Sequence, residues 1–199
     1  MYVVVGLGNP GRRYAASRHN VGFMVIERLS DRWRIPLTVD DAVRMGSGEF
    51  REASVTLVEP QRYMNLSGDA LVDALPELEP TTGDERDAST ELIVVHDDMD
   101  LARGRLRIKR GGGSGGHRGV ESIAMKIGTD FLRVRVGVGR PADGEDAATH
   151  VLSSLDADER AELASVVERA ADAVESLICD GLEATRNRFN QRAATAART

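Results

Sequence analysis

The chain has 199 residues, of which 41% are hydrophobic and 29% are charged, and its formal net charge at pH 7 is −6. This composition is ordinary for a folded protein, and the length suits one domain with a sizeable buried core. The longest apolar runs are far too short to span a membrane, and the single cysteine, Cys179, excludes an intrachain disulfide and a cysteine-based metal cluster. No basic and then apolar leader precedes the first apolar segment, so we expect a cytoplasmic protein.

The first half of the chain alternates between strand and helix patterns. An almost wholly apolar strand is predicted over residues 2–7, followed by an amphipathic helix over 20–33. A second strand is predicted over 54–59, then a short helix over 68–78 that Pro76 interrupts, and then a buried strand over 91–96.

The second half continues this alternation. Strands are predicted over 104–110 and 131–139, where basic and apolar residues alternate, with an amphipathic helix between them over 119–128. A long C-terminal amphipathic helix follows the capping pair formed by Asp156 and Glu159. Strands that alternate with helices in this way predict one α/β domain.

The remaining segments are predicted from their composition. The polar and acidic stretch 79–90 reads as a surface loop, and the apolar neighbours of Cys179 place that residue in a packed helix position. We expect the α/β domain to cover residues 1–190 and the last residues, 191–199, to form a flexible tail.

Positive charge is concentrated in one region of this acidic chain. Between Arg103 and Arg140 there are ten lysines and arginines but only two acidic residues, so this segment carries +8 and the remainder −14. On the two alternating strands the basic side chains share faces, which indicates a local anion-binding surface.

A glycine motif follows the first strand. Residues 6–11, GLGNPG, fit the dinucleotide-binding pattern G-x-G-x-x-G, but that site needs a helix directly after the glycines and an acid at the end of the next strand. Here the predicted helix begins only near Asn20, so a nucleotide-cofactor site is not favoured.

Polar side chains follow several strand ends, where ligand sites collect in open α/β sheets. We therefore expect five of them to converge: Asn9, His19, Asn65, Asp97 and His117. The three acids at 97, 98 and 100 also suggest a metal loop, although His96 is expected to be packed in the core rather than to act as a ligand.

The chemistry that this set permits is limited. No serine or cysteine of the chain stands in a recognised nucleophile setting. A histidine held by an aspartate can act as a general base toward water, and asparagine amides can stabilise an oxyanion. This combination suits hydrolysis of an activated acyl bond such as an ester.

At these residues the chain resembles a known family. The motifs GLGNPG…Y…RHNVGF, YMNLSG, HDDMDL and GGGSGGHRG, with DGLEATRNRFN near the end, are similar in order and spacing to those of bacterial-type peptidyl-tRNA hydrolases. The resemblance implies a monomeric α/β enzyme with a twisted mixed sheet flanked by helices and with no metal or cofactor. It also implies cleavage of the ester that joins a peptide to the 3′-terminal ribose of tRNA.

The resemblance implies a role for each matched position. His19 becomes the general base, Asp97 holds its ring, and Asn9 and Asn65 hold the ester and the attacking water. The other implied assignments are a peptide and 3′-end site at Tyr14, Met64, Asn65, His117 and Arg118, and a tRNA phosphate site at Lys109 and Arg135.

One position departs from the family pattern. The family usually has asparagine after the histidine of the glycine loop, whereas this chain has Arg118, which donates hydrogen bonds but cannot accept them. We therefore expect altered recognition of the peptide end. The alternative is a non-catalytic RNA-binding homologue of the same fold.

Overall fold

In the computed structural model, which describes residues 1–79, 90–144 and 146–191, seven strands form one sheet in the order β2-β3-β4-β1-β5-β7-β6. Three parallel pairings make its centre, joining β1 (Tyr2–Gly6) to β4 (Ala53–Pro60) and β5 (Glu91–Asp98), and β5 to β7 (Leu132–Gly137). The outer strands are antiparallel to their neighbours: β2 (Thr38–Asp40), β3 (Val43–Phe50) and β6 (Leu106–Arg110).

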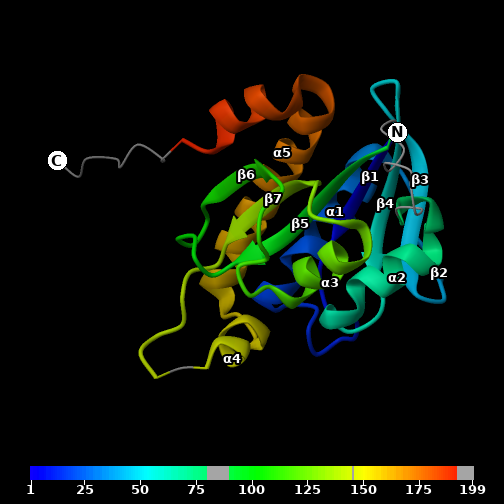
Figure 1. Cartoon of the computed structure of the whole chain (residues 1–199). Coiled ribbons are helices and arrows are strands. Elements are labelled where there is room, and N and C mark those ends of the chain that lie inside the picture. Colours follow the sequence, from blue (N-terminus) through cyan, green and yellow to red (C-terminus); the bar gives the residue numbers. More distant parts are fainter. Residues whose placement is uncertain (80–89, 145, 192–199) are drawn as a thin grey trace.

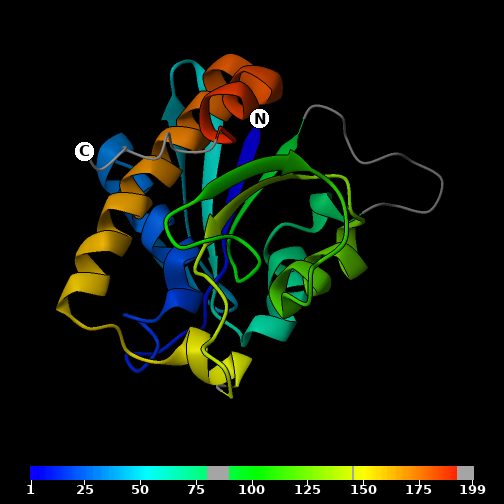
Figure 2. The same cartoon turned by 90° about the vertical axis from the view of Figure 1, so that its left-hand side faces the viewer.

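Helices cover both faces of this sheet (Figure 1, Figure 2). On one face, α1 (Val21–Trp33) and α5 (Ala157–Phe189) pack on residues of alternate register such as Val4 and Ile93. On the other, α2 (Ser67–Ala74) and α3 (Arg118–Ile127) pack on the intervening residues. Burial on both faces explains why β1 and β5 are almost wholly apolar.

Four short elements complete the described fold: η1 (Arg18–Asn20), η2 (Met64–Leu66), η3 (Pro76–Leu78) and α4 (Ala147–Leu152). The first two lie just beyond the carboxyl ends of β1 and β4. α4 lies at the same end of the molecule, where it precedes α5 in Figure 1. Several of the connecting segments therefore gather at the carboxyl ends of the central strands.

The predicted α/β class and mixed sheet are confirmed, with shifts of one or two residues at element ends. α2 ends at Ala74 and a separate 3₁₀ turn begins at Pro76, as the proline requires. The predicted cap of α5 is also confirmed, because Asp156 and Glu159 form a reciprocal capping box.

Three features differ from the sequence prediction. The hairpin of β2 and β3 was not predicted, because β2 is exposed throughout and β3 lacks an apolar period. The six-residue α4 is too short to show periodicity. Cys179 is exposed rather than packed, because its position falls outside the apolar stripe of α5.

The predicted acidic loop at 79–90 and the predicted tail at 191–199 lie almost entirely outside the described residues. Among the helices that the structure does describe, none combines the length and the apolar character needed to cross a membrane.

Candidate active site

A cleft of about 510 Å³ opens at the carboxyl end of the central strands. It brings together all five polar residues that were predicted to converge, and Met64 and Arg118 line it as well. The walls come from the β1, β4 and β5 ends, the glycine loop before α3, and α4.

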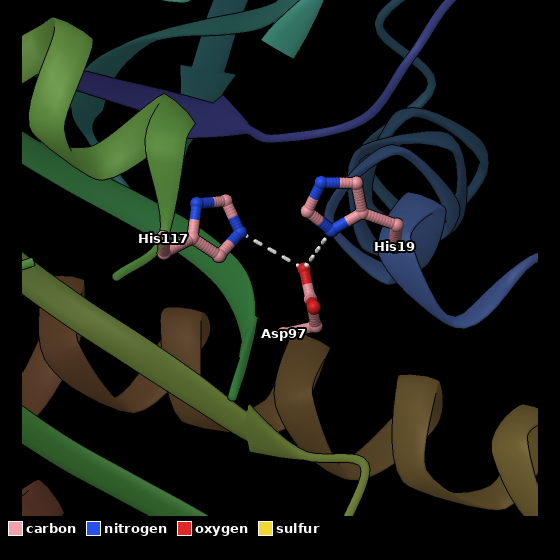
Figure 3. Close-up of side chains that lie close together, drawn as sticks. All are labelled: His19, Asp97 and His117. Carbon is pink, nitrogen blue, oxygen red and sulfur yellow. Dashed lines mark hydrogen bonds and ion pairs between the residues drawn. The ribbon is translucent and has the colours of Figure 1, made fainter. Parts of the chain in front are cut away.

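The centre of this cleft is a cluster of two histidines around one carboxylate (Figure 3). His19 Nδ1 lies 2.8 Å from Asp97 Oδ1, and His117 Nε2 lies 2.9 Å from the same oxygen. The Asp97 side chain is only 3% exposed, and the two ring centroids are 5.0 Å apart. Residues that are 78 and 20 positions from Asp97 in sequence thus meet at the end of β5.

The hydrogen bonds assign a tautomer to each ring. The backbone N–H groups of Gly119 and Val120 donate to His117 Nδ1 at 3.2 and 3.4 Å, so His117 carries its proton on Nε2 and donates it to Asp97. His19 in turn donates from Nδ1. Its Nε2 accepts no hydrogen bond from the part of the chain that the structure describes, so its lone pair is available within the cleft.

The two N–H donors keep Asp97 ionised. Burial alone would raise the pKa of Asp97, but the interactions with His117 and His19 outweigh it and hold that pKa well below its usual range. At neutral pH the site therefore contains a negative charge next to the His19 ring.

His96, next in sequence, does not belong to this cluster's hydrogen bonds. It is 1% exposed, as predicted for a core histidine, and it donates from Nδ1 to the Asp97 carbonyl oxygen at 2.6 Å. Burial, with the neighbouring His117 and Arg133, lowers the pKa of His96 well below normal, so it stays neutral.

Two imidazoles and a carboxylate, which offer one ligand atom each within 4.8 Å of one another, are also a composition that metal sites use. To ligate through Nε2, His117 would have to carry its proton on Nδ1. That nitrogen faces the N–H groups of Gly119 and Val120, so metal binding would break the cap of α3. The hydrogen-bonding of His117 therefore opposes a metal at this centre.

Asn9 is fixed so that only its amide N–H groups remain available. Its Oδ1 accepts the Met64 backbone N–H at 2.9 Å, and its own backbone N–H and carbonyl pair with the Asn20 side chain, both at 2.9 Å. Asn9 Nδ2 is thus left as a hydrogen-bond donor at the cleft. Asn20 was missed from the sequence, although it directly follows His19.

Arg18, which precedes His19, anchors the same turn to α4 and α5. Its Nη1 donates to the His150 carbonyl at 3.0 Å and to Ser153 Oγ at 3.2 Å, and its Nη2 pairs with Glu159. The side chain is 10% exposed. The contacts with His150 and Ser153 tie the turn that carries His19 to α4, which forms one wall of the cleft.

A basic surface lies beside the cleft on β6 and β7. Lys109 faces Arg133 and Arg107 faces Arg135 across the two strands, so the predicted phosphate residues Lys109 and Arg135 share one sheet face. Burial and the three arginines lower the pKa of Lys109. Arg135 Nε lies 2.5 Å from Asp98 Oδ2, its counter-ion.

Arg133 differs from the other cations of this surface because it is buried. It donates to the Gly113 carbonyl at 2.8 Å and to His96 Nε2 at 2.9 Å, and burial lowers its pKa to about 10. Arg133 therefore holds the glycine loop over the sheet.

Of the residues predicted to line the cleft, Tyr14 is not brought into it, and the two residues of the predicted phosphate site also lie outside it. Tyr14 lies in the turn after Gly11, and the two phosphate-site residues, Lys109 and Arg135, lie on β6 and β7. The sequence prediction missed Tyr63, which is 60% exposed beside Met64, and the α4 wall. Tyr63 opens the YMNLSG motif, which was the available signal for it, whereas the short α4 segment carries no motif.

Comparison with known proteins identifies the family. The family described as peptidyl-tRNA hydrolase matches residues 3–197. The chain belongs to the peptidyl-tRNA hydrolase family. A peptidyl-tRNA hydrolase of Caldanaerobacter subterraneus subsp. tengcongensis is 44% identical over 96% of this chain and 100% of its own length, and one of Rubrobacter xylanophilus is 45% identical over 95% and 100%.

Solved structures of the family agree. The crystal structure of peptidyl-tRNA hydrolase from Acinetobacter baumannii covers 96% of this chain and 94% of its own, with 33% identity and a TM-score of 0.83. A complex of peptidyl-tRNA hydrolase with n-propanol gives 32% identity and a TM-score of 0.84, over 98% and 97%. In this structure the GLGNPG segment forms the end of β1 and the turn that carries Asn9.

Proposed function

We propose that the chain hydrolyses the ester between a peptide and the 3′-terminal ribose of tRNA, releasing free peptide and tRNA. The observation that carries the proposal is the His19–Asp97 contact of 2.8 Å, which leaves His19 Nε2 available in a cleft. A base held in this way can activate water at neutral pH.

The proposed reaction begins with water in contact with His19 Nε2. As the water oxygen attacks the ester carbonyl carbon, its proton passes to Nε2, and Asp97 stabilises the imidazolium that forms. Asn9 Nδ2 donates to the developing oxyanion. When the tetrahedral intermediate collapses, the ribose oxygen leaves with the proton that His19 returns.

Other cleft residues are assigned to substrate binding. Asn65, which is exposed in the cleft beside the Asn9–Met64 contact, binds the ester end, and Met64 packs against it. Tyr14 contacts the substrate from the neighbouring turn. Arg118 is exposed at the cleft and offers donors to peptide carbonyl oxygens, but it cannot accept from a peptide N–H.

The tRNA is assigned to the basic surface of β6 and β7, with Lys109 and Arg135 on a backbone phosphate of the acceptor stem. Recognition there follows backbone shape, because phosphate contacts carry no sequence information. We expect the enzyme to act as a monomer in the cytoplasm, without a cofactor.

Release of peptide from purified peptidyl-tRNA tests the proposal. Wild type should turn over, and His19→Ala should lose at least about 10³-fold in rate because water then lacks its base. Binding of peptidyl-tRNA without turnover by the wild type would instead favour the non-catalytic RNA-binding alternative.

A further inference from the structure

Both ring nitrogens of His117 are occupied by the protein itself. Nδ1 caps α3 by accepting the N–H groups of Gly119 and Val120, and Nε2 donates to Asp97. The side chain is 8% exposed. Although it borders the cleft, neither nitrogen is left to hydrogen-bond a substrate.

The Asp97 oxygen that His117 contacts is the one that His19 contacts. Oδ1 accepts from His19 Nδ1 at 2.8 Å and from His117 Nε2 at 2.9 Å, and both dashed lines in Figure 3 end on that atom. A carboxylate oxygen that already accepts one hydrogen bond attracts a second proton donor less strongly. His117 therefore weakens the hold of Asp97 on His19.

We propose that His117 is a positioning residue that fixes Asp97 and limits how tightly this carboxylate retains a proton on His19. The inference rests on the proposed role of His19 as base. The cap is what makes His117 suited to the task, because two backbone N–H groups pin its tautomer and so keep its Nε2 proton directed at Asp97.

Other charged groups near this cluster do not supply the same effect. The His96 ring is 4.9 Å from His117, but its hydrogen bonds are made to Arg133 and to a backbone carbonyl. Arg118 of α3 faces the cleft, as do the acids that line its walls: Asp98 at the end of β5, Asp100 just after it and Asp146 before α4. Arg18, on the His19 turn, is paired with Glu159 of α5.

Two substitutions separate the roles of the two ring nitrogens of His117, the helix cap at Nδ1 and the hydrogen bond to Asp97 from Nε2. In His117→Asn the side-chain oxygen reaches the Nδ1 position and can cap α3, but nothing reaches Asp97. In His117→Gln the side-chain amide reaches the Nε2 position and can donate to Asp97. The measurement is the pH dependence of peptide release from peptidyl-tRNA between pH 5.5 and 8.

For His117→Asn we expect the acid limb of the profile to move to higher pH by about half to one unit, because Asp97 then holds the His19 proton more tightly. The rate relative to wild type should accordingly fall about three- to tenfold further at pH 6 than at pH 8. His117→Gln should keep the wild-type limb, whereas its melting temperature should fall further than that of His117→Asn.

Two results would overturn the inference: an unmoved acid limb in His117→Asn, or equal shifts in both variants. Nitrogen chemical shifts of the wild-type imidazoles give a second readout, expected to show the Nε2–H form of His117; the Nδ1–H form would also overturn it. His19→Ala distinguishes failure of the His117 inference from failure of the proposed function. If His19→Ala retained turnover, His19 would not be the base and the proposed function of this site would fail as well.

Discussion

Replacing Asp97 with asparagine should remove a charge from the site while leaving its geometry in place. His19 and His117 both donate to one oxygen of Asp97, and an asparagine carbonyl oxygen can accept the same two N–H groups. The cap contacts at Nδ1 keep His117 in its donating tautomer. Asp97→Asn therefore measures the electrostatic contribution of the carboxylate to the reaction.

The size of that contribution can be worked from the contact. With 2.8 Å between His19 Nδ1 and Asp97 Oδ1, the centres of the two charged groups are about 4 Å apart, and such a pair interacts by about 4 kcal/mol at an effective dielectric constant of about 20. Because the imidazolium forms only as water is deprotonated, this energy appears in the barrier, where about 4 kcal/mol corresponds to about three powers of ten in rate.

Single-turnover hydrolysis of purified peptidyl-tRNA is the assay. For Asp97→Asn we expect kcat to fall about 10³-fold with little change in KM, because the lost interaction is made mainly in the transition state. The acid limb of the pH profile should also move to lower pH, since the His19 imidazolium has lost its counter-ion.

Asp100→Asn is the matched control, since Asp100 lines the same cleft but pairs with the exposed Arg140. It should change the rate by less than about threefold. A loss of under about tenfold in Asp97→Asn, or a loss confined to KM, would show that the Asp97 charge does not stabilise the reacting imidazolium.

Three further outcomes are expected. Asn9→Asp keeps an oxygen that can accept the Met64 N–H but replaces the Nδ2 donor with a negatively charged oxygen, so single-turnover kcat should fall at least about 10²-fold. An unchanged kcat would exclude Asn9 from the oxyanion site. In filter-binding titrations, Lys109→Ala and Arg135→Ala should each reduce the slope of log affinity against log salt by about 0.7 to 0.9, and unchanged slopes would remove the phosphate assignment. Glu59 is 2% exposed, and burial raises its pKa to about 7 although Arg44 lies 2.9 Å away. The stability that protonated Glu59 contributes is therefore fully present below about pH 4.5 and is lost as pH rises through 7. The unfolding free energy of Glu59→Gln relative to wild type, from urea titrations, should therefore rise by about 2 kcal/mol between pH 5 and pH 8; a constant difference would contradict the buried-charge account.

Much of the fold and of the candidate site could be predicted because the responsible patterns are local. Continuous apolar runs marked the buried strands, and the residues that follow strand ends marked the cleft, since parallel strands end at a common edge. Asn9, His19 and Asp97 were placed together on that basis, and the cleft contains all three.

What the sequence could not show depends on contacts between distant residues. The basic alternation of 131–139 marked Arg133 and Arg135 alike, yet Arg133 is buried beneath the glycine loop because the Gly113 carbonyl and His96 satisfy its guanidinium. The shared oxygen of Asp97 is equally invisible in sequence, because it depends on the separate turn that aims His117.

The rigidity of the base follows from three consecutive side chains that point to three different parts of the molecule. Arg18 is tied to α4 and α5, His19 to the end of β5, and Asn20 to the turn of Asn9 after β1. A side chain anchored on both neighbours loses little entropy on reaching its working geometry, which is how a preorganised site lowers a barrier. Asn20 also fixes Asn9, whose Oδ1 accepts from the Met64 N–H, so the same turn positions both the proposed base and the proposed donor. The proposed chemistry therefore depends on the hydrogen bonds that hold this turn against its neighbours as much as on the histidine that the turn carries.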